Sequence, residues 1–141
     1  MPPGIQTVAV LPFDNLTAEP ALLQQVNDAV REAMQNRLGL RQATEEQADA
    51  VVRGSITRYE PDVPVAFTGG AQQDNQVEVR RRLVQLTVNV EILDRRNNRT
   101  LWQRQGLMVE GDYEPGQEQQ GRDKALERLM VNIVEGAQSQ W

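Results

Sequence analysis

The stretch VQLTVNVEI, residues 84–92, decides the fold, because apolar and polar residues alternate along its whole length. Such alternation is typical of a β-strand with one buried face and one polar face. We therefore predict an antiparallel sheet that is covered on one side only. The apolar set is Val84, Leu86, Val88, Val90 and Ile92.

The residues on either side of this strand predict how it pairs. Upstream, Val77 and Val79 have the opposite phase, which predicts a bulge or bend at the arginines 80–82. Downstream, residues 94–100 (DRRNNRT) predict a hairpin turn. Two registers remain open for the return strand, about 100–112. A two-residue turn puts Leu101, Leu107 and Val109 on the core face, and a turn one residue longer or shorter favours Trp102 and Met108.

The amino-terminal part predicts a strand, a helix and a second strand. Residues 5–11 form an apolar run that stops at Pro12. Thr17 is the expected N-cap of a helix whose apolar residues recur at helical spacing as far as Leu38, and Gly39 is its expected stop. Residues 50–59 then predict a second strand, parallel to the first with a right-handed crossover.

A second helical pattern over residues 115–138 completes the order β-α-β-β-β-α. This predicts an α/β (α+β) two-layer sandwich, with a four-stranded mixed sheet and two helices on one face, in one domain over residues 1–141. Residues 61–76 (PDVPVAFTGGAQQDNQ) predict a long loop, because prolines, glycines and polar residues dominate it.

Composition restricts the possible functions. The chain has no Cys and no His, so thiolate chemistry, zinc knuckles and a histidine base are excluded. The one lysine has no nearby Ser, and Asp14, after the first strand, has neither a base nor a second clustered acid near it in the sequence. We interpret Asp14 as a turn residue and predict a protein that is not an enzyme, with no catalytic residues, no cofactor and no metal.

Charge is unevenly distributed. Residues 77–104 hold seven arginines against three acidic residues, a local charge of +4 in a chain of net charge −5. One interpretation is a surface that binds phosphate groups, such as those of a lipid head group, through bidentate guanidinium contacts. The other is a solvated hairpin face whose arginines pair with neighbouring carboxylates. Nucleic acid is disfavoured, because the overall charge is acidic and only Trp102 lies near for stacking.

The sequence as a whole resembles the lipopolysaccharide-assembly lipoprotein family LptE. The similarity rests on TVAVLPFDNLTAEP (7–20), ADAVVRG (48–54), VQLTVNVEILDRRNNRTLW (84–102) and a final helix near the carboxyl terminus. The family implies a lipid-anchored domain on the periplasmic side of the outer membrane, inside the lumen of the LptD β-barrel, that helps deliver lipopolysaccharide to the cell surface. The lipid-bearing Cys and the signal peptide of the family are missing from these residues.

The resemblance and the charge pattern together suggest partners and site residues. We expect lipopolysaccharide phosphates to contact Arg80, Arg81, Arg82, Arg95, Arg96 and Arg99, a set chosen from charge clustering alone. We expect the barrel to contact the 61–76 loop and the polar face of the central strand, at Val65, Phe67, Gln85, Thr87 and Asn89. The alternative is a periplasmic protein-docking domain of TolB-like type that does not touch lipid.

Overall fold

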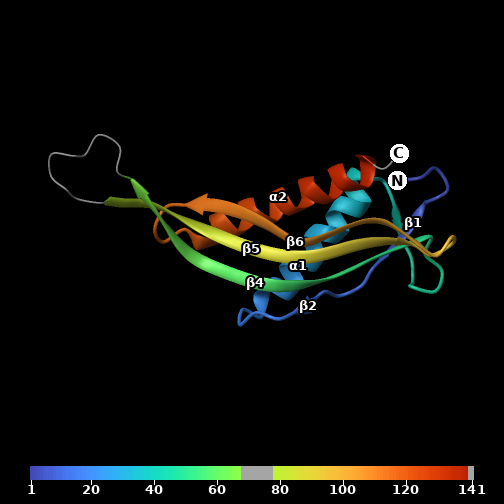
Figure 1. The fold of residues 1–141 in the computed structure, drawn as a ribbon, viewed down its shortest axis with the longest axis horizontal. Helices are drawn as coiled ribbons and strands as arrows, with labels where there is room; N and C mark the ends of the chain where they lie inside the picture. Colours follow the sequence, from blue (N-terminus) through green and yellow to red (C-terminus); the bar gives the residue numbers. More distant parts are fainter. Residues whose placement is uncertain (68–77, 140–141) are drawn as a thin grey trace.

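The computed structural model describes residues 1–67 and 78–139, and in it the chain forms one mixed sheet with two long helices (Figure 1). The sheet order is β3-β1-β4-β5-β6, with β2 pairing with β4 beside this path. In chain order the elements are β1 (Thr7–Val10), β2 (Asp14–Asn15), α1 (Ala21–Glu32), the π-helical turn η1 (Ala33–Arg37), β3 (Arg41–Gln42), β4 (Ala50–Phe67), β5 (Glu78–Asp94), β6 (Arg99–Tyr113) and α2 (Glu118–Ser139).

The central strand β5 follows the predicted pattern. Its residues Val84, Leu86, Val88, Val90 and Ile92 are buried in one core with apolar residues of both helices, whereas the residues between them are half-buried. The sheet therefore has a helix-covered face and an open face. The alternation in the sequence predicts this asymmetry because buried side chains must share one side of a pleated strand.

The sheet contains more strands than we predicted. The expected four are present as β1, β4, β5 and β6, and β1 pairs with β4 in parallel as predicted. Two further strands of two residues each join them, β2 beside β4 and β3 beside β1, so the predicted order was wrong. Two residues are too few to show a period of two, so neither strand has a signal in the sequence.

Much of the predicted 61–76 loop is instead strand. Pro61 to Phe67 belong to β4, which pairs with β5 as far as Phe67 opposite Glu78. Pro61 lies where the pairing is irregular, between Glu60 and Val63, and Pro64 pairs with Arg82 where β5 is the one described partner of β4. Prolines are accepted both at bulges and on edge strands. The rest of the predicted loop, residues 68–76, lies outside the described residues.

The long hairpins reach their registers through bulges. Arg81 pairs with Val65 and Val79 with Ala66, so Arg80 is the extra residue, which confirms the bulge predicted among the arginines. Leu101, Leu107 and Val109 are buried, whereas Trp102 is half-buried and Met108 is 51% exposed. Of the two registers left open, the first therefore has the correct core-facing residues, but the two-residue turn from which we derived it is not present. The turn spans four residues, 95–98, and irregular pairing near residues 101 and 106 restores the phase.

Helix α1 begins later than predicted. Its N-cap is Pro20, not Thr17, and Thr17 instead accepts a hydrogen bond from the Glu19 backbone N–H (3.2 Å) within the preceding turn. The helical segment ends in η1, and Gly39 follows with a φ of 72°, which confirms the predicted glycine stop. Of the helices that the structure describes, none is long and apolar enough to cross a membrane.

Helix α2 lies close to β6 because glycine occupies both sides of the contact. A Cβ atom on Gly111 of β6 would lie 1.8 Å from the Gly121 carbonyl oxygen, and one on Gly121 would lie 2.4 Å from the Tyr113 ring. Glycine destabilises the interior of a helix, and Gly121 is present in α2 because this contact leaves no room for a side chain. The contact fixes α2 across the covered face of the sheet.

Candidate functional site

The six predicted phosphate-binding arginines do not form one cluster. Arg81 and Arg82 lie near the beginning of β5, and Arg95, Arg96 and Arg99 lie around the turn at its other end, where the amino terminus also lies (Figure 1). Thirteen strand residues at about 3.3 Å each separate the two groups by about 40 Å. A single phosphate-bearing head group therefore cannot contact both groups.

At the beginning of β5 the arginines are engaged in ion pairs. Arg81 binds Asp112 on β6 (2.8 Å from Nε), and Arg82 binds Asp62 on β4 (2.5 Å). Lys124 of α2 also donates to Asp112 (3.2 Å), and together with Arg81 it holds the pKa of that carboxyl below its usual value. These pairs connect β4, β5, β6 and α2. The side chain of the sixth predicted arginine, Arg80, lies outside the described residues.

At the turn end the arginines have weaker partners. Arg95 lies 3.5 Å from Glu45, and Arg99 lies 3.9 Å from Asp94. Arg96 donates to the Gly4 carbonyl oxygen (2.7 Å) and has no carboxylate within ion-pair distance among the described residues. All three side chains are exposed. This end of the molecule therefore has guanidinium groups that an external anion can reach.

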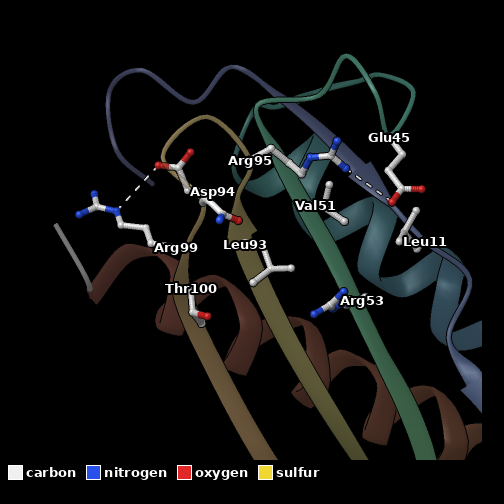
Figure 2. Close-up of a pocket in the computed structure, with 10 residues that line it drawn as sticks. Leu11, Glu45, Val51, Arg53, Leu93, Asp94, Arg95, Arg99 and Thr100 are labelled. Carbon is white, nitrogen blue, oxygen red and sulfur yellow. Dashed lines mark ion pairs between the residues drawn. The ribbon is translucent and has the colours of Figure 1, made fainter.

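A hollow of about 510 Å³ opens at this end, which we call the turn hollow (Figure 2). Arg95 reaches across it to Glu45, and Arg99 approaches Asp94 at its rim. Three guanidinium groups and two carboxylates surround it, so it presents both signs of charge. Its lining residues are Leu11, Glu45, Val51, Arg53, Leu93, Asp94, Arg95, Asn98, Arg99 and Thr100.

A second hollow of about 440 Å³ continues from the first along the open face, and we call it the central hollow. Leu11 and Arg53 line both, and the side chain of Arg53 is also ion-paired with Glu91 across the sheet. Asp14, which we interpreted as a turn residue, instead belongs to β2, and it lines the central hollow together with Ser55, Asn89 and Gln105. Hydrogen-bonding side chains predominate here, and the surface is shallow and polar.

The predicted barrel-contact residues of β5 lie on this open face. Gln85 donates to Glu110 (2.9 Å), and Asn89 accepts the Gly106 backbone N–H (2.8 Å), so both bridge neighbouring strands. Thr87 lies between them and pairs with Met108. Val65 is half-buried near the end of β4, about 40 Å from the turn, and the side chain of Phe67 lies outside the described residues.

Sequence reasoning missed Arg53 and Glu45 as parts of this surface. Arg53 lies between Gly54 and the buried Val52 on β4, so its place on the open face follows from the alternation of side chains along a strand. Glu45 comes from the connection between β3 and β4, and no periodic signal in the sequence places it against Arg95. Of the residues that the structure describes, none gather into a group of three acidic side chains suited to a metal ion.

Asp94 is the buried anion that shapes the turn. It is 2% exposed and accepts hydrogen bonds from the backbone N–H groups of Arg96 (2.9 Å) and Asn97 (3.1 Å), and from the Asn97 amide (2.9 Å). Burial alone would raise the pKa of Asp94, but these bonds and the charge of Arg99 lower it below the usual value. The carboxylate is therefore bound in its ionised form, and its role is structural.

Asp94→Asn should lower the free energy of unfolding by about 2 kcal/mol at pH 7, since hydrogen bonds to a buried charge are lost. The folded pKa of Asp94 lies below its unfolded value, so its contribution is complete above about pH 5 and is lost as pH falls through the folded pKa. Urea unfolding from pH 7 to pH 2.5 should show that the free energies of unfolding of the wild type and Asp94→Asn converge in acid. A constant difference at every pH would contradict this role.

Comparison with known proteins agrees with the fold and identifies the family. The PelC dodecamer structure from Paraburkholderia phytofirmans aligns with a TM-score of 0.56 at 17% identity, covering 94% of this chain and 87% of that one. A putative lipoprotein from Caulobacter crescentus aligns with a TM-score of 0.52 at 15% identity, covering 91% of this chain and 89% of that one. Protein XCC0632 from Xanthomonas campestris aligns with a TM-score of 0.58 at 13% identity, covering 92% of this chain and 81% of that one. At these identities the likeness establishes the fold alone.

Among curated proteins there is no match. The family model described as LptE, lipopolysaccharide-assembly, matches residues 5–137 and so spans every element from β1 to the last turns of α2. The match includes the hairpin turn, both hollows and the glycine contact. The chain therefore belongs to the LptE lipopolysaccharide-assembly family.

Proposed function

We propose that this protein is a non-enzymatic assembly factor of the outer membrane that occupies the lumen of an LptD-type β-barrel and binds lipopolysaccharide during its delivery to the cell surface. The observation that carries the proposal is the family match over residues 5–137. In the native protein we expect the domain to lie on the periplasmic side, attached through a lipid.

The open face supports the barrel-contact part of the proposal. The lumen of an outer-membrane barrel is polar, and the open face presents half-buried Gln85, Thr87 and Asn89, the last of which lines the central hollow. A polar surface suits a polar wall because the polar groups on each side can form hydrogen bonds with those on the other. We assign the barrel contact to this face and keep Val65 and Phe67 as proposed contacts near the end of β4.

The turn end supports the lipid-contact part. Arg95, Arg96 and Arg99 are exposed, and guanidinium groups bind phosphate oxygens bidentately. Arg80, Arg81 and Arg82 remain candidates for a second contact. Of these, Arg81 and Arg82 must first give up the carboxylates that they bind. We therefore expect the turn arginines to contribute more of the affinity.

The test is purification of affinity-tagged variants from the native outer membrane, followed by measurement of barrel and lipopolysaccharide in the same eluate. The double variant Arg95→Glu/Arg96→Glu should retain the barrel and lose lipopolysaccharide by about tenfold or more, since two charge-assisted contacts become repulsive. Thr87→Arg should instead reduce the amount of barrel that co-purifies, because it places a long charged side chain on the face that contacts the barrel.

Arg31→Glu, on the exposed side of α1, is a control for charge reversal at a distant site and should change the recovery of neither the barrel nor lipopolysaccharide. Retained lipopolysaccharide in the double variant would overturn the lipid assignment at the turn. Wild-type protein that retains the barrel but carries no lipopolysaccharide would instead favour the alternative function, a protein-docking domain that does not touch lipid. That alternative is supported by one observation, that Arg81, Arg82, Arg95 and Arg99 already have carboxylate partners.

A further inference from the structure

The strand β6 forms one edge of the sheet, and it is long. It runs for 15 residues, whereas β3 at the opposite edge has two. An edge strand presents unpaired backbone groups that can accept a further strand. Gly106, with a φ of 66°, interrupts β6 at a bulge, so the regular part of this edge runs from Leu107 to Tyr113.

A hollow of about 260 Å³ lies beside this regular part, between β6 and α2, and both apolar and polar residues line it. Met108 (51% exposed) and Val131 (36% exposed) line it. They are two of the four large apolar residues that are exposed in the part of the chain described by the structure. We call the hollow and the adjoining edge, residues 107–113 with Arg128 and Val131, the edge groove.

Arg128 of α2 shows which backbone groups are available in the edge groove. Its Nη1 donates to the Glu110 carbonyl oxygen (2.7 Å), so that carbonyl points away from β5. Since alternate residues of a strand share a direction, the backbone groups of Met108 and Asp112 point the same way. Outward-facing groups with flanking apolar side chains are what strand addition requires.

The charge of the edge groove indicates what kind of segment fits it. Arg128 has no carboxylate partner among the described residues, and the carboxylate of Glu110 is turned toward Gln85 on the open face. A guanidinium group at an apolar edge favours an acidic side chain on the incoming strand. Pairing of two copies of β6 about a two-fold axis would instead bring two unpartnered arginines into one groove.

We propose that the edge groove is a docking site for an extended segment of a partner protein that carries an acidic residue among apolar ones. The segment adds to β6 along residues 107–113. Its acidic side chain forms an ion pair with Arg128, which then no longer donates to the Glu110 carbonyl oxygen. That carbonyl can accept a backbone hydrogen bond from the added strand. Its apolar side chains cover Met108 and Val131. Met108 pairs with Thr87, so the edge groove borders the open face that we assign to the barrel, whereas Arg128 and Val131 lie on α2.

Two synthetic peptides test the proposal, acetyl-TVEVTV-amide and its lysine counterpart acetyl-TVKVTV-amide. Hydrogen exchange of the full chain should show slower exchange at the Met108, Glu110 and Asp112 amides with the acidic peptide. Affinity for the lysine peptide should be weaker by about tenfold, the worth of one charge-assisted contact. Arg128→Glu should weaken acidic-peptide binding by at least as much, and Arg128→Lys should keep most of it.

Arg41→Glu is the matched control, because Arg41 lies on the other edge strand and likewise has no carboxylate within ion-pair distance among the described residues. It should leave binding unchanged. Equal affinity for the two peptides, or no protection at these amides at millimolar peptide, would overturn the proposal. Sedimentation that shows a dimer lost in Met108→Asp would also overturn it, by naming a second copy as the occupant.

Discussion

Replacing Gly111 with alanine is expected to lower the free energy of unfolding by about 3 kcal/mol or more, the upper range for overpacked positions. The added Cβ would lie 1.8 Å from the Gly121 carbonyl oxygen and 2.8 Å from the Ala125 backbone nitrogen. Both are backbone atoms, so no side-chain rotation relieves the overlap. Helix α2 must move away from β6, and the apolar contacts between them weaken along the whole helix.

Urea unfolding followed by circular dichroism measures this effect. The control is Gly4→Ala, where the nearest atom to the new Cβ is the end of the flexible Arg96 side chain (2.8 Å). That variant should unfold within about 1 kcal/mol of the wild type, since a flexible side chain moves at low cost. If Gly111→Ala were as stable as Gly4→Ala, the close approach of α2 to β6 would not be a property of the protein in solution.

The sequence predicted the long regular elements because burial imposes a period on them. In β5 five apolar residues must share one face, and any other phase would expose them all. The same argument places Gln85, Thr87 and Asn89 on the open face without any knowledge of their partners. Gly39 was predictable for a related reason, since a left-handed φ after a helix favours glycine.

Elements that depend on tertiary contacts or on local hydrogen bonds, and not on a periodic pattern of apolar residues, were not predictable. The two-residue strands β2 and β3 exist because the chain passes beside β4 and β1, which is a matter of tertiary contact. Pro61 and Pro64 suggested a loop, yet β4 continues through them. Pro61 lies in irregular pairing, and Pro64 lies where β4 pairs with β5 on one side only, so neither has to donate an N–H to the ladder. The α1 start moved from Thr17 to Pro20 because Thr17 bonds within the preceding turn.

The candidate site shows the same division. Six arginines close in sequence suggested one basic surface, but an extended strand separates residues 82 and 95 by about 40 Å. Alternation along β4 was enough to place Arg53 on the open face. By contrast, the partners of the arginines, such as Asp112 for Arg81 and Glu45 for Arg95, come from distant elements. Pairing across the fold therefore decides how much of the local positive charge is available to a ligand.

A buried cation joins the base of the β4–β5 hairpin to both helices. Arg122 of α2 is 7% exposed and donates to the Tyr59 hydroxyl (3.0 Å), Glu118 (2.7 Å) and Gln25 of α1 (3.3 Å). Its guanidinium carbon also lies 5.3 Å from the centre of the Tyr59 ring. Burial raises the pKa of Tyr59 to about 12, so this hydroxyl stays protonated and donates a hydrogen bond to Glu118 (3.1 Å).

Arg122→Met should therefore lower the free energy of unfolding by about 2–4 kcal/mol, because truncating one member of a buried polar network leaves the others unpaired. Tyr59→Phe keeps the ring and removes only the hydroxyl, so a smaller loss of about 1 kcal/mol is expected. In the double variant the two losses should not add, since both remove the same hydrogen bond. Urea unfolding of the four proteins gives the coupling energy directly.

Arg31→Ala is the contrasting change, because its pair with Asp28 lies on the exposed surface of α1. Exposed pairs contribute about 0.5 kcal/mol or less, so this variant should unfold nearly as the wild type does. A loss at Arg122 no larger than that at Arg31 would mean that the network adds nothing to stability. A large loss with full additivity would mean that Arg122 acts through its packing against α1 and the sheet, and that its bond to Tyr59 is incidental.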